Sequence, residues 1–131
     1  MTGGRAVAML EFNLTAVTYN VSSVNLNQAV LIIYNITTKV HSSIDTAWRQ
    51  WQKEEFIPLT MQTGCFINAK LLHLLEQDDS EGKTYALQLT AETVDMYEVY
   101  VNEHAALARQ NTLERWGNKI ISFHSLLEVI H

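Results

Sequence analysis

Six segments, each patterned for a strand or a helix, follow the first thirty residues, and their order constrains the fold more than any other feature. The first, LIIYNITTKV at 31–40, is rich in β-branched and aromatic residues, which is typical of a strand. Side chains alternate along a strand, so one face would carry Ile32, Tyr34, Ile36 and Val40. The regular part of the chain therefore begins with a strand.

The second segment, SSIDTAWRQWQKEEF at 42–56, predicts a helix. Ser42 or Ser43 can cap its N-terminus, and Pro58 should end it shortly afterwards. Apolar residues recur at helical spacing on one side: Ile44, Ala47, Trp48 and Trp51.

Two strands joined by a polar loop come next. We expect the strands at 65–76 and 84–92, with the loop at 77–83 and Gly82 near its end. The second of them would place four apolar residues on one face: Tyr85, Leu87, Leu89 and Ala91.

A second helix and a last strand complete the pattern. Thr90 or Thr93 can cap a helix that runs to about Trp116, where Gly117 would stop it. The segment 119–130 then reads as a strand.

The order βαββαβ predicts an α+β domain with a four-stranded antiparallel sheet and both helices on one face. The other face would be bare and too apolar to leave in water, so we expect a homodimer through it, a dimeric α+β barrel. The residues expected on that face are Leu31, Ile33, Ala69, Leu71, Ala86, Ile120 and Leu126, with Asn35, Gln88, His73 and His124 among them.

Several motifs resemble a small bacterial family of uncharacterised proteins that share a domain of unknown function. They are LIIYNIT, WRQWQKEEFIP, TGCFINAKLL, YALQLT, EHAALAR and LERWGNKIISFHSLLEVI. The resemblance covers Leu31 to His131 and implies a ferredoxin-like, dimeric α+β-barrel fold, without an activity.

The tryptophan-rich first helix, Ile-Pro and the Thr-Gly-x-Phe turn are more distantly similar to antibiotic-biosynthesis-type monooxygenases and stress-responsive barrel proteins. Phe56 stands where the family tends to carry a histidine before Ile-Pro, which removes a possible ligand or proton carrier.

Composition excludes several classes of function. The net charge of −5 comes with acids spread along the chain, which argues against a nucleic-acid partner, and no apolar run is long enough to cross a membrane. Cys65 is the single cysteine, so neither an internal disulfide nor a cysteine metal cluster is possible. No metal-ligand spacing or cofactor motif stands out. A cytoplasmic protein without metal or cofactor is the simplest interpretation.

Residues 1–30 differ from the domain at 31–131. They contain one Arg and one Glu and are rich in Asn, Ser, Thr and Val. We interpret them as a weakly ordered extension or as a start assigned too far upstream, with Val30 standing for a GTG start codon. An extra edge strand within Leu10 to Leu26 is the alternative.

Glu55 continues the stripe that Trp48 and Trp51 begin on the first helix. One interpretation is an acid in a ligand pocket between helix and sheet, next to the two tryptophans. The other is an exposed side chain in a fraying last turn, with the tryptophans in the core.

His104 and Arg109 are the candidates on the second helix. His104 borders its apolar side, where an imidazole can transfer protons or bind a ligand, or can simply be half-buried. Arg109 can pair with a substrate carboxylate or remain a solvated charge.

Three functions follow as hypotheses. The first is a homodimer that binds a small organic molecule between its helices and sheet, and the second is a cofactor-independent monooxygenase- or isomerase-like barrel enzyme that uses His104 and Glu55 for proton transfer. The third is a structural or regulatory dimer without a pocket.

Overall fold

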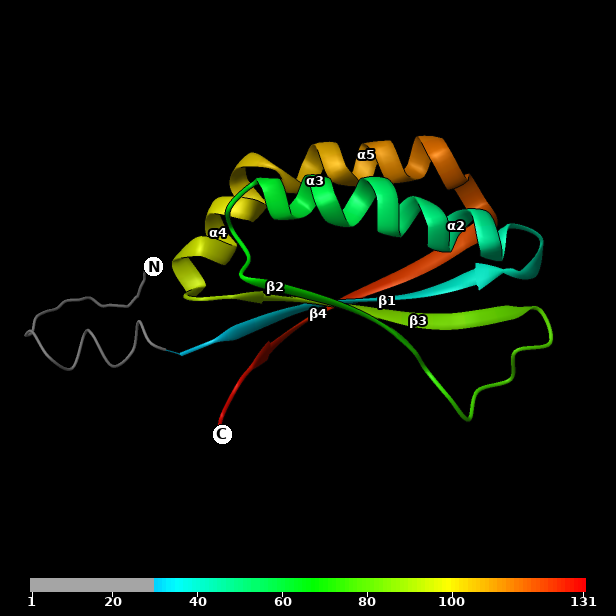
Figure 1. Ribbon diagram of the computed structural model, residues 1–131, viewed down its shortest axis with the longest axis horizontal. Coiled ribbons are helices and arrows are strands. Elements are labelled where there is room, and N and C mark those ends of the chain that lie inside the picture. The colour runs from blue at the N-terminus through cyan, green and yellow to red at the C-terminus, as the bar shows by residue number, and fades with distance from the viewer. Residues whose placement is uncertain (1–29) are drawn as a thin grey trace, which may run out of the picture.

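The computed structural model describes residues 30–131, in which one curved sheet carries all the helices on one face (Figure 1). The proposed extension lies outside the described residues, apart from Val30. No helix in the described part of the chain is long and apolar enough to cross a membrane.

The sheet has four antiparallel strands in the order β2-β3-β1-β4. Its strands are β1 Ile32–His41, β2 Asn68–His73, β3 Gly82–Ala91 and β4 Ile120–Glu128. Together with the helices between them, they give the βαββαβ order predicted from the sequence. β2 is shorter than the predicted 65–76, because Cys65 and Phe66 precede it and lie buried in the core.

The first helical arm is longer than predicted, because Pro58 does not end it. A 3₁₀ turn at Ser42–Ile44 leads into α2 (Asp45–Trp51), a π-helical segment (Gln52–Phe56) and α3 (Ile57–Gln62). The Ile57 N–H bonds the Gln52 carbonyl, five residues back, and Pro58 then occupies the first turn of α3, where a missing N–H costs least.

The second arm is broken, although one continuous helix was predicted. α4 (Val94–Glu103) begins at Thr93, whose hydroxyl accepts a hydrogen bond from the Met96 N–H. His104 leaves the helical conformation, and α5 (Ala105–Trp116) continues to Gly117, which has φ of 55°. The break places His104 at a bend between two helices.

Residues on the two faces of the sheet are fixed by the strand pairing. Tyr85, Leu87, Leu89 and Ala91 are buried under the helices, as predicted. Ala69, Leu71 and His73 pair with β3 residues of that same face, and Ile120, His124 and Leu126 pair with β1 residues of that face. The prediction that these six residues lie on the bare face is therefore wrong.

The bare face, called here the open face, carries other apolar residues of β2 and β4. Their side chains are exposed: Leu72, Ile121, Phe123 and Leu127. Leu71–Leu72, Ile120–Ile121 and Leu126–Leu127 are apolar pairs, so alternation does not decide which member faces the helices, and a shift of one residue exchanges the faces.

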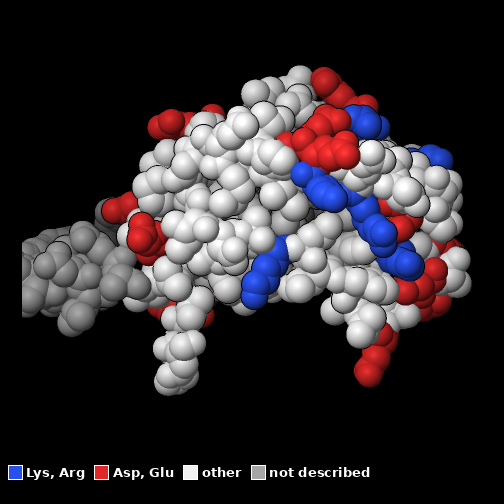
Figure 2. All heavy atoms as spheres, in the orientation of Figure 1, with Lys and Arg blue, Asp and Glu red and all other residues white. Residues whose placement is uncertain are grey.

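The core beneath the helices has two parts. One surrounds Tyr34, Phe66 and Tyr100, and the other joins Val40, Trp48, Trp51, Tyr85 and Trp116. On the face in view, basic side chains form a short diagonal row with acidic side chains beside it (Figure 2).

Candidate functional site

Two hollows lie beside the helices. The outer groove, of about 610 Å³, runs between the two helical arms and is lined by Trp51, Glu55, Thr60, Tyr100, His104 and Arg115, among others. The inner cavity, of about 320 Å³, lies between helices and sheet and is lined by Tyr34, Trp48, Gln52, Arg109, Ser122 and His124, among others.

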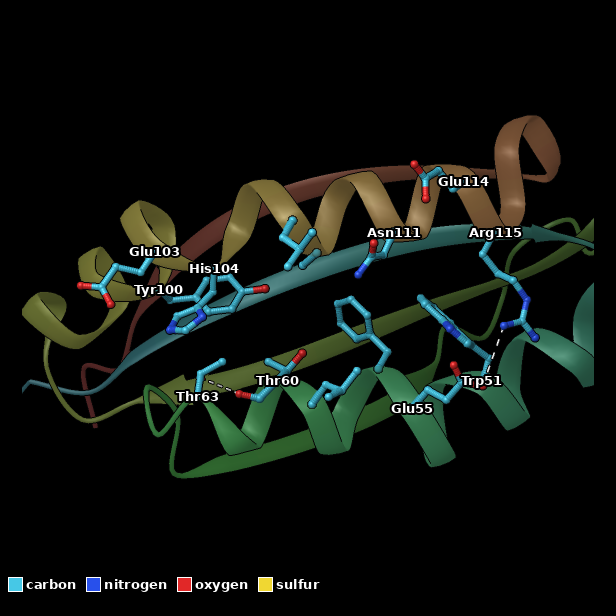
Figure 3. A pocket seen from close by; sticks show the side chains of 14 residues that line it. Trp51, Glu55, Thr60, Thr63, Tyr100, Glu103, His104, Asn111, Glu114 and Arg115 are labelled. Atoms are coloured by element: carbon cyan, nitrogen blue, oxygen red, sulfur yellow. Dashed lines mark hydrogen bonds and ion pairs between the residues drawn. The ribbon is translucent and has the colours of Figure 1, made fainter.

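Glu55 and His104 line the outer groove from its two ends (Figure 3). At one end the Glu55 carboxylate lies 3.8 Å from the Arg115 guanidinium, and its side chain is 56% exposed. At the other end the His104 ring stacks on Tyr100, with centroids 6.0 Å apart. An exposed ion pair of this kind stabilises little, and the proton-transfer pair hypothesised for Glu55 and His104 is not assembled here.

The inner cavity brings together side chains from two strands of the sheet and from both helical arms. β1 contributes Tyr34 and Thr38, β4 contributes Ser122 and His124, and α5 contributes Arg109. Trp48 from α2 and Gln52 from the π-helical segment close it from the first arm. The Thr38 and Ser122 hydroxyls hydrogen-bond each other at 2.9 Å across neighbouring strands.

Tyr34 and His124 form a hydrogen-bonded pair in this cavity, between the Tyr34 hydroxyl and His124 Nδ1. Burial raises the pKa of Tyr34 to about 12; Tyr100 adds to the rise, and the charge of Arg109 opposes it. Burial, and then the charge of Arg109, lowers the pKa of His124 below its ordinary value. Both groups are therefore neutral at neutral pH.

Arg109 is the one lining residue of the inner cavity with a permanent charge. Among the described residues it forms no ion pair with a carboxylate. Its charge instead acts on three neutral groups: Tyr34, Tyr100 and His124.

Gln52 and Trp48 present buried polar atoms with no hydrogen-bond partner among the described residues. They are Gln52 Oε1 and Trp48 Nε1, on side chains that both line the inner cavity. Gln52 is only 6% exposed. Leaving a buried polar group unpaired costs about 1–3 kcal/mol, so a hydrogen bond from a ligand to either atom would recover this cost.

The residues predicted for one pocket are thus divided between two hollows. Trp48 and Arg109 line the inner cavity, Glu55 and His104 line the outer groove, and Trp51 borders both. Sequence reasoning missed Tyr34, Gln52 and His124 as site residues. Tyr34 was already placed on the helix-facing side, and the correct face for β4 would have added His124.

No metal centre is built from the described residues, which contain no group of three His, Cys, Asp or Glu side chains able to hold an ion. Cys65 is buried in the core.

A four-stranded antiparallel sheet with two helical arms on one face defines the ferredoxin-like class of α+β proteins. Residues 31–130 match the family model of a domain of unknown function, DUF4286, and the chain belongs to that family. The family resemblance inferred from the sequence is confirmed. The search of curated proteins found no match.

Solved structures confirm the fold. One is described as a dimeric ferredoxin-like protein from an uncultured marine organism; it is 7% identical, with a TM-score of 0.58, and the match covers 78% of this chain and 97% of that one. Another is a Bacillus cereus protein whose description proposes an antibiotic-biosynthesis monooxygenase; it is 13% identical, with a TM-score of 0.53, and the match covers 78% of this chain and 95% of that one.

Proposed function

We propose that the protein binds a small organic molecule in the inner cavity. The buried Gln52 Oε1 carries this proposal, because it has no hydrogen-bond partner among the described residues and belongs to a side chain that lines the cavity. A volume of about 320 Å³ is within the range of small-ligand sites, and mostly apolar walls with a few polar groups are typical of them. These features favour ligand binding over a dimer without a pocket.

The proposed assembly is a homodimer through the open face. Exposed Leu72 lies on one edge strand, and Ile121, Phe123 and Leu127 lie on the other. Two copies related by a two-fold axis would bury both apolar edges, whereas one layer of helices leaves them in water. The marine neighbour is described as dimeric, and we propose the same state here. A cytoplasmic location stays a prediction.

Filling the cavity tests the proposed function. Thr112 lines the inner cavity but not the outer groove, so Thr112→Phe should reduce the space for a ligand, while Thr112→Val replaces the hydroxyl with a methyl group of similar size. Native mass spectrometry should detect a bound small molecule on the wild type and Thr112→Val, but not on folded Thr112→Phe. A molecule retained equally by all three, or by none, would count against the inner cavity.

A cofactor-independent oxygenase or isomerase is the second candidate, favoured by the Tyr34–His124 pair in the cavity. A neutral imidazole can take a proton from a bound carbon acid, and Arg109 can stabilise the resulting anion. Such an enzyme should exchange a carbon-bound proton of its ligand with D₂O, observed by NMR, and His124→Asn should stop the exchange. A ligand bound in the wild type without exchange would rule this chemistry out.

A further inference from the structure

We propose that the ligand of the inner cavity is a planar organic acid, bound as its anion against Arg109 and hydrogen-bonded to Gln52 through a hydroxyl group. This inference rests on the proposed function and specifies the chemical class of the ligand.

The charge of the cavity wall supports an anion. Arg109 is the permanently charged residue among those lining the inner cavity, and no described carboxylate pairs with it. Its planar guanidinium matches a carboxylate in a two-point hydrogen bond. The neutral Tyr34–His124 pair adds hydrogen-bonding groups without compensating the charge.

The outer groove has more acidic than basic lining residues. Glu55, Glu103 and Glu114 line it together with Arg115, and Arg115 is already paired with Glu55. Figure 3 shows Arg115 turned towards Glu55. An organic anion would meet repulsion there, so the inner cavity is the better site for it.

The aromatic and polar lining residues of the inner cavity further restrict the chemical class of the ligand. Its aromatic lining residues are Tyr34, Trp48, Trp51, Phe56, Tyr100 and His124. Flat rings of this kind pack well on a planar molecule. Gln52 Oε1 is an acceptor without a partner among the described residues, so it would accept a hydrogen bond from a ligand hydroxyl.

The probe is 6-hydroxy-2-naphthoate, compared by isothermal titration calorimetry with its neutral amide and with 2-naphthoate. The wild type should bind the hydroxy acid about tenfold more tightly than the amide, because a charged hydrogen bond is lost with the carboxylate. Loss of the hydroxyl should weaken binding several-fold, and Gln52→Leu should remove that difference.

Arginine variants locate the carboxylate. Arg109→Gln should lose about tenfold in affinity for the acid and little for the amide, whereas Arg109→Lys should keep part of the preference. Arg115→Gln is the matched control and should bind as the wild type does. Thermal unfolding checks that each variant is folded. We expect all of them to fold, because Arg109 and Arg115 are exposed.

Three outcomes would overturn the inference. If the amide binds as tightly as the acid, the ligand-binding function stands and the acid class fails. If Arg115→Gln rather than Arg109→Gln loses affinity for the acid, the anion binds in the outer groove. If the wild type does not bind the acid, the class is wrong, while a ligand detected on the purified protein would still support the proposed function.

Discussion

At the level of single residues, the polarity of the inner cavity is set by two neutral side chains, Tyr34 and His124, beside the charged Arg109. Tyr34 and His124 hydrogen-bond each other. Burial raises the pKa of Tyr34 and lowers the pKa of His124, and both shifts favour the neutral side chain. Arg109 lowers the pKa values of both, so it stabilises their deprotonated forms and makes a charged imidazolium unfavourable.

The lowered pKa of His124 predicts a pH effect on stability. Below the ordinary histidine pKa of about 6.5, the unfolded chain binds a proton that folded His124 resists, so the wild type loses stability as the pH falls through this value. Chemical denaturation between pH 7.5 and 5.5 should show a steeper loss for the wild type than for His124→Asn. His41→Asn, at an exposed site, is the control, and equal slopes in wild type and His124→Asn would contradict the prediction.

At the level of elements, the close approach of β3 to the end of β1 requires a glycine. A Cβ added to Gly82 would lie 1.9 Å from the Val40 carbonyl oxygen, which is backbone and cannot turn away. Gly82→Ala should therefore cost about 3 kcal/mol or more of unfolding free energy, measured by urea denaturation. Gly64→Ala is the control: φ of +76° is strained for alanine, but no atom lies within 4 Å, and about 1–2 kcal/mol is expected. A loss no larger at Gly82 than at Gly64 would contradict this account.

Local signals in the sequence predicted the order of elements and many of their ends. Thr93 caps α4 and Gly117 follows α5, because capping hydroxyls and a positive φ are requirements of one residue. The continuation of the helix through Pro58 was not predictable in this way. It depends on the π-helical segment before Pro58, after which the proline lies in the first turn of α3.

The candidate site was predicted only in part for a related reason. Trp48 and Trp51 were named because their helical spacing is clear, and Arg109 because its charge can pair with a carboxylate. His124 was assigned to the wrong face, because Ile120–Ile121 and Leu126–Leu127 leave the alternation of β4 undefined until its pairing with β1 is known. Gln52 had no signal, since its burial depends on packing between arm and sheet.

At the level of the whole molecule, helices cover one face of the sheet (Figure 1). On the other face, the edge strands carry exposed apolar side chains. Sedimentation at micromolar concentration should show a particle near twice 14.9 kDa. Phe123→Glu should shift it towards the monomer, because Phe123 is 70% exposed on the open face and a charge there would be buried by a partner. Leu59→Glu, on the helical side, should leave the dimer intact. A wild-type monomer would rule the dimer out.

The proposed domain boundary predicts that a chain starting at Val30 folds. The sheet, both helical arms and both parts of the core lie within residues 30–131. The shortened protein should unfold cooperatively in urea with a midpoint close to that of the full chain. A broad, non-cooperative transition would show that residues before Val30 belong to the domain.

The location of the ligand is the central claim, and an NMR titration of ¹⁵N-labelled protein with 6-hydroxy-2-naphthoate tests it most directly. The side-chain amide of Gln52 reports on the inner cavity and that of Asn111 on the outer groove, because each lines only one of the two hollows. We predict that the Gln52 amide and the Trp48 indole signals shift with saturation, while the Asn111 amide stays in place. Shifts at Asn111 with none at Gln52 or Trp48 would contradict the account.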